Sequence, residues 1–283
     1  SRAACATNAS IMDGCEGLVG FGDEYDTTAG LVASAANPVE INYNSFFPSG
    51  AHAVTLGGSA GLGNINFLSN SNYIDISNNY AKDVRVLIST KVVTFATFSN
   101  VTVTNNNFID DNVFGGLNAG FPNILWQDNR HTGTGTLDGP YAAYMFAMVN
   151  MSSDTTPGLV NRNIFYSFFR SIFAKSGIRY SNNAFLYNWH HAIVMQGRNG
   201  YYGGVASRTV FDHNIFASSH QSQALDGFDS GFAGTVLVDN LSLINNTWMG
   251  FDTCIRIGDT DAAIIMLINT KIYNNICATG ASS

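Results

Sequence analysis

The sequence has little charge, and the charge it has is mostly acidic. Only 12% of its 283 residues are charged, about half of the usual share in a soluble domain. Lysine and arginine number 13 against 20 acidic residues, which gives a net charge of −7. Such a chain offers no basic stripe to neutralise phosphates, so a nucleic-acid-binding function is not expected.

The sequence also lacks the motifs that mark membrane spans, metal sites and serine nucleophiles. No apolar run reaches the roughly 18 residues that a membrane-spanning helix needs. The carboxylates of Asp23, Glu24 and Asp26 lie close together but match no complete calcium loop, and a solvated acidic turn explains them more simply. No serine lies in a G-x-S-x-G elbow. We therefore expect neither a metal nor a cofactor.

Cysteine is scarce, and its four residues lie two near each end of the chain: Cys5, Cys15, Cys254 and Cys277. Three pairings are possible in principle. This placement favours one disulfide within each pair, and four buried free thiols are the alternative. No C-x-x-C spacing indicates a metal site. Disulfides would place the protein in an oxidising compartment, outside the cell or at its surface.

What the sequence does have is a recurring six-residue phrase: apolar, any, polar, Asn, any, apolar. Its clearest copy is residues 180–185, and we call the Asn of each copy the anchor Asn. Successive anchors lie 27, 23, 34, 20, 31, 32 and 29 residues apart when the weak copy at Asn129 is counted. Another weak copy has Asn44. The good anchors are Asn79, Asn106, Asn163, Asn183, Asn214, Asn246 and Asn275.

The residues around the anchors predict strands that meet at a turn. Alternating runs such as 73–76 and 241–243 precede several anchors, and alternation sends every second side chain inward. Asn tolerates left-handed backbone angles, and its amide can satisfy the backbone groups of a turn. Amides stacked on similar turns above and below would form a ladder, as in a solenoid whose coils bury one another.

A second strand-like run follows several anchors, for example 191–197 after Asn183 and 254–258 after Asn246. The pattern resembles the right-handed parallel β-helix repeat of the pectin-lyase-like superfamily. This resemblance implies an all-β fold, a single right-handed parallel β-helix (solenoid). We expect residues 1–35 to form an N-terminal cap and residues 36–283 to form the β-helix. The superfamily contains lyases, hydrolases, phage spikes and non-catalytic surface proteins, so the fold alone does not fix a function.

Aromatic residues occupy one position in the repeat, two residues after the anchor. Equal offsets on successive coils stack about 4.8 Å apart. We therefore predict a stacked aromatic column made of Phe108, Phe165, Phe185, Phe216 and Trp248.

The same alignment points to one candidate for catalysis. Arg170 and His190 both lie seven residues after an anchor, and His220 is one residue away from that register. These catalytic candidates would lie in a groove for an acidic polysaccharide, where Arg neutralises a uronate and His moves a proton. The alternative is a polar ladder that only closes a turn. Asp226 and Asp229 are a second candidate, as a carboxylate pair for glycoside hydrolysis.

Several N-x-[ST] sequons are compatible with an extracellular location. Asn100 and Asn240 each lie six residues before an anchor, in segments that we expect to be exposed. Asn245 lies inside the repeat phrase and is a weaker candidate. Sequons also arise by chance in an Asn-rich chain. The candidate glycosylation sites are Asn8, Asn100, Asn150 and Asn240.

Three functions are compatible with these features. The first is a secreted or cell-surface structural glycoprotein, as the repeating subunit of an extracellular filament. The second is a polysaccharide lyase or glycoside hydrolase, and the third is a non-catalytic carbohydrate-binding module. Low charge favours the first, and so does the absence of the two catalytic phrases of polygalacturonases, an Asn-Thr-Asp-Gly and a Gly-His-Gly. No capping helix pattern follows Asn275, so we expect either further chain or end-to-end self-association to cover the last coil.

Overall fold

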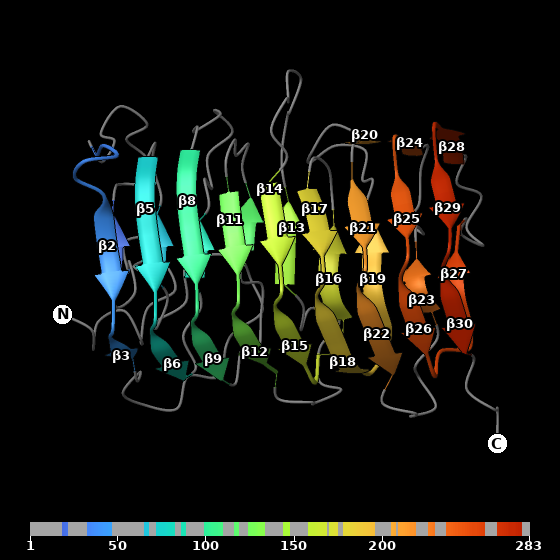
Figure 1. Cartoon of the computed structure of the whole chain (residues 1–283), viewed down its shortest axis with the longest axis horizontal. Helices are drawn as coiled ribbons and strands as arrows, with labels where there is room; N and C mark the ends of the chain where they lie inside the picture. The colour runs from blue at the N-terminus through green and yellow to red at the C-terminus, as the bar shows by residue number, and fades with distance from the viewer. Residues whose placement is uncertain are drawn as a thin grey trace, which may run out of the picture.

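A computed structural model of the protein shows an all-β chain of stacked coils (Figure 1). It describes residues 19–21, 33–46, 65–67, 72–82, 86–88, 99–109, 116–118, 124–133, 144–147, 158–168, 170–174, 178–195, 205–207, 209–218, 226–229, 236–257 and 265–278. Within these residues, no helix has the length and hydropathy needed to cross a membrane.

Three parallel sheets of nine strands each run along the molecule. The first sheet contains β1 (Val19–Phe21), β4 (Ile65–Phe67), β7 (Val86–Ile88), β10 (Gly116–Asn118), β13 (Tyr144–Ala147), β16 (Arg170–Ala174), β19 (His191–Met195), β23 (Asp226–Asp229) and β27 (Thr253–Arg256). The second contains β2 (Val39–Asn42), β5 (Asn72–Ser77), β8 (Ser99–Thr104), β11 (Ile124–Gln127), β14 (Gly158–Asn161), β17 (Ile178–Ser181), β21 (Val210–Asp212), β25 (Ser242–Ile244) and β29 (Lys271–Tyr273). The third contains β3 (Ser45–Phe46), β6 (Tyr80–Lys82), β9 (Asn107–Ile109), β12 (Arg130–Thr132), β15 (Ile164–Tyr166), β18 (Ala184–Asn188), β22 (Ile215–Ser218), β26 (Thr247–Met249) and β30 (Ile276–Ala278). A fourth sheet of three strands contains β20 (Val205–Ser207), β24 (Val236–Asp239) and β28 (Ile265–Ile268).

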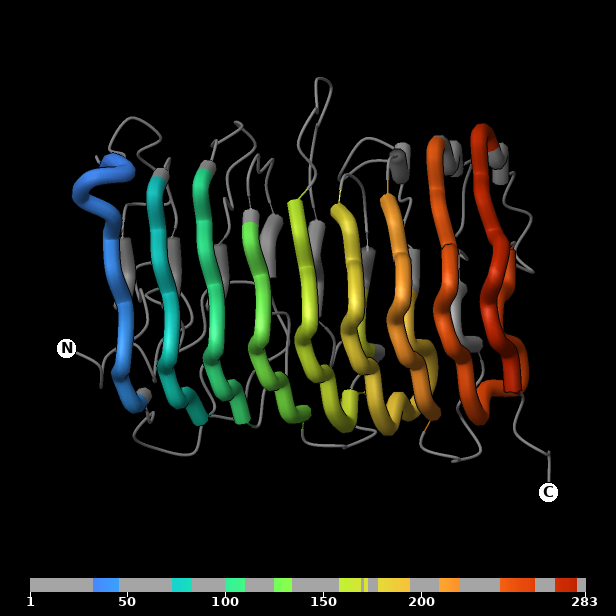
Figure 2. The backbone as a smooth tube through the Cα atoms, viewed as in Figure 1, coloured from blue at the N-terminus to red at the C-terminus, as the bar shows by residue number. Residues whose placement is uncertain are grey.

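Each coil takes one strand from each of the three long sheets in turn, and every strand pairs with the equivalent strand of the next coil. In Figure 1 the second-sheet strands run downward at the front and the first-sheet strands run upward behind them, while the coils advance from left to right. The path is therefore a right-handed coil. The predicted all-β parallel solenoid is confirmed, and Figure 2 shows the same bend recurring between the second and third sheets.

The repeat phrase explains which side chains form the core. The position three residues before the anchor faces inward from the second sheet, and the position two residues after it faces inward from the third. Nearly every apolar residue at these two positions has at most 1% of its surface exposed to solvent. They include Ile76, Val103, Trp126, Val160, Tyr180, Phe211, Leu243, Ala81, Phe108, Phe165, Phe185, Phe216 and Trp248.

The parallel sheets begin earlier than the sequence predicts. Strand β1 lies within the segment expected to be a cap, and it pairs with β4 in the register Val19 to Ile65. The predicted boundary at residue 36 therefore does not mark the start of the sheets. The remainder of the predicted cap before residue 33 lies outside the described residues.

Candidate functional site

The corner between the second and third sheets has the same backbone geometry in every coil. The residue immediately before each anchor Asn has a left-handed conformation, with φ between 53° and 59°. Asn, Asp and His adopt this region more readily than most residues, which explains the Asn-Asn and Asp-Asn pairs of the repeat. Nine residues form this corner row: Tyr43, Asn78, Asn105, Asp128, Arg162, Asn182, His213, Asn245 and Asn274.

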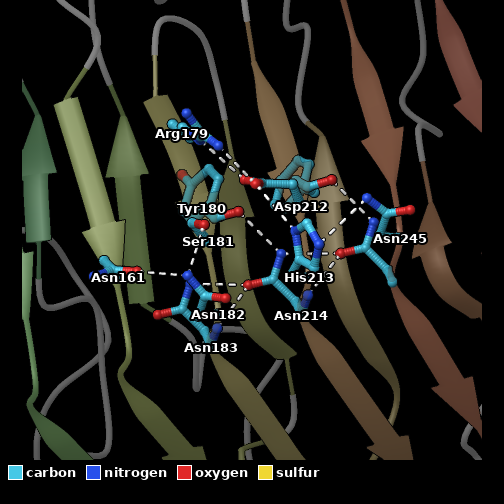
Figure 3. Close-up of polar contacts among 12 residues, drawn as sticks. Asn161, Arg179, Tyr180, Ser181, Asn182, Asn183, Asp212, His213, Asn214 and Asn245 are labelled. Carbon is cyan, nitrogen blue, oxygen red and sulfur yellow. Dashed lines mark hydrogen bonds and ion pairs between the residues drawn. The ribbon is translucent and has the colours of Figure 1, made fainter.

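The anchor Asn side chains form a continuous hydrogen-bonded ladder along the inside of this corner. Each anchor donates its backbone N–H and its Nδ2 to the Oδ1 of the next anchor, at 2.9–3.0 Å and 2.9–3.1 Å. From Asn79 onward each Nδ2 also donates to a carbonyl of the preceding coil, at 2.6–3.0 Å. The ladder includes Asn44 and Asn129 as well as the seven good anchors (Figure 3 shows Asn183 and Asn214).

A polar cluster lies on the outside of the corner, across β17, β21 and β25 (Figure 3). Arg179 donates from Nε to Asp212 Oδ1 at 3.1 Å and from Nη2 to Asp212 Oδ2 at 2.7 Å. His213 Nδ1 lies 3.4 Å from Asp212 Oδ2, and Asn245 Nδ2 lies 3.4 Å from His213 Nε2. The side chains of Arg179 and His213 are 51% and 58% exposed, whereas that of Asp212 is 9% exposed. The cluster therefore presents a cation and an imidazole to solvent above a largely buried carboxylate.

The surroundings of Asp212 favour its ionised form. Burial raises the pKa of its carboxyl group, but hydrogen bonds from Arg179, His213 and Ser181 and the Arg179 charge outweigh burial, so that this pKa lies below its ordinary value. The hydrogen bond to Asp212 and its charge raise the pKa of Arg179. The pair is a charge-assisted, bidentate contact between neighbouring coils.

A second ion pair links the corner row two coils earlier. Arg162 donates from Nε and Nη2 to the two carboxylate oxygens of Asp128, at 2.8 and 2.7 Å. The hydrogen bond from Arg162 lowers the pKa of Asp128, and partial burial opposes this effect. Both side chains are partly solvated, at 55% and 32% exposed, so this pair contributes little to the free energy of folding.

The aromatic column that the sequence predicts is present, with a histidine inside it. His131 stacks between Phe108 and Phe165, with ring centroids 5.0 and 4.7 Å apart. Stacking continues through Phe185, Phe216 and Trp248 at 4.9, 4.8 and 4.0 Å.

His131 is fully buried, and its Nε2 accepts a hydrogen bond from Trp126 Nε1 at 3.0 Å. This acceptor role requires a neutral ring. The repeat contains the signal for this residue, because His131 occupies the same offset as the phenylalanines of the column.

The predicted alignment of Arg170 with His190 is wrong. Strand register places Arg170 opposite His191 of the next coil. Phe168 and Asn188 are equivalent, because the N–H of Trp189 donates to the Phe168 carbonyl, so the later coil contains one extra residue before His191. Counting from the anchor cannot detect this insertion.

The two histidine rings of this region still lie together. His190 and His191 are 3.9 Å apart between ring centroids and edge to face. The structure describes only the backbone of Arg170, in β16. His220 lies outside the described residues. A catalytic role of Arg170, His190 and His220 stays a prediction.

The remaining predicted residues fall in three places. Asp226 and Asp229 lie in β23, where the structure describes only the backbone. Asn100 and Asn240 both have left-handed φ values of 56°. Asn240 is exposed at the entry to β25, as expected, whereas Asn100 lies within β8 and is half-buried. Cys5, Cys15, Asn8 and Asn150 lie outside the described residues.

A disulfide joins Cys254 to Cys277, with the Cα atoms 6.0 Å apart. Cys254 lies in β27 and Cys277 in β30, which are the first and last strands of the ninth coil. Cys277 pairs with Trp248 in the register that carries the aromatic column. The disulfide therefore closes the last coil across its interior.

No family model, no curated protein and no solved structure matches this chain.

Proposed function

We propose that this protein is a secreted or cell-surface structural glycoprotein whose function is to form a rigid rod. The observation that carries the proposal is the ladder of anchor Asn side chains from Asn44 to Asn275, continuous through nine coils. Side-chain amides inside a stack of parallel strands add hydrogen bonds between coils to those of the backbone. Coils joined in this way resist bending and local opening, which suits a load-bearing or spacing role.

Three further features support an extracellular rod in the fold of the pectin-lyase-like superfamily. The Cys254–Cys277 disulfide is typical of proteins in an oxidising compartment. The right-handed parallel coil and the phrase around each anchor are those that the resemblance implies. The low charge of the chain, 12%, leaves a surface dominated by neutral hydrogen-bonding groups.

Localisation on intact source cells tests this function directly. Antibodies against the purified chain should label the outer surface or surrounding matrix in immunogold electron microscopy, without permeabilisation. Negatively stained single molecules should be straight rods at least about 40 Å long, since nine coils advance about 4.8 Å each. Labelling that appears only after permeabilisation would contradict an extracellular structural role.

A second candidate function is carbohydrate binding without turnover, and the outer polar cluster favours it. Arg162, Asn182, His213 and Asn245 follow one another in the corner row, one to a coil. Their donors and acceptors suit the hydroxyl and carboxylate groups of an extended glycan.

A glycan array with the wild type and an Arg162→Ala/His213→Ala variant tests this binding. Neither residue belongs to the core, so the variant is expected to fold. Equal binding by the two proteins, or no binding at all, removes this candidate. A lyase or hydrolase activity remains a prediction, and turnover of uronic-acid polymers by the wild type would favour it over binding alone.

A further inference from the structure

The outer face of the third sheet is uncharged over four successive coils. Strands β15, β18, β22 and β26 are the third-sheet strands of coils five to eight, and they follow one another along the lower side of the rod in Figure 1. The side chains one and three positions after each anchor point outward, because the residue between them is buried in the core. We call these eight side chains the outer apolar face: Ile164, Tyr166, Ala184, Leu186, Ile215, Ala217, Thr247 and Met249.

The outer apolar face is open to solvent in the single chain. Ile164, Ile215 and Met249 are 37%, 44% and 39% exposed, and the other five side chains are half-buried. Apolar residues that are exposed singly are ordinary, but a contiguous patch indicates an interaction surface. The sheets of the rod are parallel, and parallel sheets in proteins are as a rule covered on both faces. We therefore expect this face to be covered by a partner.

Strand register gives the face a regular alternation of large and small side chains. In the column one residue after the anchor, Ile164 pairs with Ala184, Ala184 with Ile215, and Ile215 with Thr247. In the column three residues after the anchor the order is reversed, since Ala217 pairs with Met249. Coils six, seven and eight thus each carry one large and one small side chain in alternating order: Ala184 with Leu186, Ile215 with Ala217, and Thr247 with Met249.

This alternation makes the face complementary to itself. A two-fold axis that runs parallel to the rod between two copies keeps each coil opposite its own equivalent and exchanges the two columns. Ile215 of one copy then lies opposite Ala217 of the other, and coils six and eight likewise place a large side chain opposite a small one. Layers in which large residues face small ones interdigitate without voids. In coil five both side chains are large, so the close packing begins at coil six.

Charge and length favour this parallel arrangement over an antiparallel one. Lys82 and Arg130 are the only charged residues that point outward in the described part of the third sheet. The parallel two-fold places them opposite Tyr80 and Thr132, so that like charges do not meet directly. An antiparallel arrangement that matches the apolar coils with one another leaves at least the first three coils without a partner strand.

The size of the face indicates a weak, reversible contact. Nine strands about 4.8 Å apart and three residues of about 3.3 Å each give a face of about 43 by 10 Å, roughly 430 Å² for each copy. This lies below the roughly 800 Å² per partner of a standard stable interface, in the range of transient complexes.

We propose that two copies of this chain associate side by side, parallel and in register, through the outer apolar face of the third sheet. The proposal rests on the proposed structural function and deepens it by naming a partner of the rod. The contact is isologous, so one partner occupies the face completely and the product is a dimer. Two rods packed in this way bury the apolar face along their length.

An exchange of residue sizes in coil seven tests the arrangement. The 283-residue chain is studied by sedimentation equilibrium as the wild type, Ile215→Ala, Ala217→Ile and the double variant. The wild type should form dimers between micromolar and millimolar concentration. Each single variant should dimerise about tenfold more weakly, because two small or two large side chains then meet. The double variant should regain wild-type dimerisation, since a large side chain again lies opposite a small one.

A lysine in the same coil tests the face itself, independently of the register. Ile215→Lys should weaken dimerisation at least about tenfold, because a charge then enters an apolar contact twice in each dimer. Ile244→Lys is the matched control, since Ile244 points outward from β25 in the second sheet and is half-buried. It should dimerise like the wild type. Equal urea midpoints for all variants would show that each one folds.

Several results would overturn the proposal. One is a wild type that stays monomeric at millimolar concentration, whether or not it binds a flat polysaccharide such as cellulose instead. Others are an Ile215→Lys variant that dimerises as well as the wild type, or a double variant without recovery. Assemblies larger than a dimer would contradict an isologous contact. Surface labelling of source cells does not depend on dimer formation, so failure of the dimer and failure of the structural function are distinguishable.

Discussion

Replacement of Asn183 by alanine is the most direct test of the ladder. The side chain of Asn183 takes part in four hydrogen bonds within the buried corner. Its Nδ2 donates to the Val160 carbonyl at 2.9 Å and to Asn214 Oδ1 at 3.0 Å. Its Oδ1 accepts from the N–H and Nδ2 of Asn163 at 2.9 and 3.0 Å. Alanine removes all four bonds and leaves the Asn163 N–H without its acceptor.

The expected loss follows from this count. A net contribution of about 1 kcal/mol for each bond gives about 4 kcal/mol of unfolding free energy. This is a large fraction of the 5–15 kcal/mol that stabilises a typical domain. Asn44→Ala is the matched control. Asn44 donates only two side-chain bonds, to Asn42 and Asn79, and is exposed, so its replacement should cost about 1 kcal/mol or less.

Urea unfolding followed by circular dichroism measures both variants. Hydrogen exchange should locate the loss of protection in Asn183→Ala to the coils on either side of the substitution, because solenoid coils interact mainly with their neighbours. If Asn183→Ala and Asn44→Ala lower the unfolding midpoint equally, the ladder does not stabilise the interior of the rod and the reasoning is refuted.

Three further predictions concern single features of the rod. His131→Phe keeps the aromatic column but removes the acceptor of the Trp126 Nε1 hydrogen bond, so it should lower the unfolding free energy by about 1–3 kcal/mol; an unchanged urea midpoint would contradict this. The lowered pKa of Asp212 means that its ion pair stabilises the fold above the unfolded-state value near 4 and loses this effect as pH falls through the lower folded value. Arg179→Met should therefore lower stability at pH 7, by less than about 1 kcal/mol because Arg179 is half exposed, and should match the wild type once the pH lies below the lowered folded pKa of Asp212. Replacing Cys254 and Cys277 by serine opens a crosslink between residues 23 apart, worth about 3 kcal/mol in the chain-entropy account, and exchange protection should fall in the ninth coil but not in the middle of the rod.

Local chemistry made the ladder and core predictable from the sequence. The corner requires a side-chain amide at the anchor position and a left-handed backbone at the residue before it. Both requirements restrict the residue type at their own position, so both are visible within the six-residue phrase. The inward positions of the core lie at fixed offsets from that Asn. The same offsets place His131 in the aromatic column, although its copy of the phrase is weak because histidine replaces phenylalanine.

The contacts between coils were decided by the tertiary structure. Arg179 and Asp212 are 33 residues apart, and the length of the intervening chain determines that their side chains meet on the outer face. One additional residue between Asn188 and His191 moves His191, instead of His190, opposite Arg170. The sequence by itself determined the repeated corner and the inward residues, because each depends on neighbours a few residues away, and the resemblance of the repeat to a known pattern predicted the parallel coil. Only the folded chain decided which outward side chains form pairs, because each insertion in a connection between coils shifts which residues of the following strand lie opposite the preceding coil.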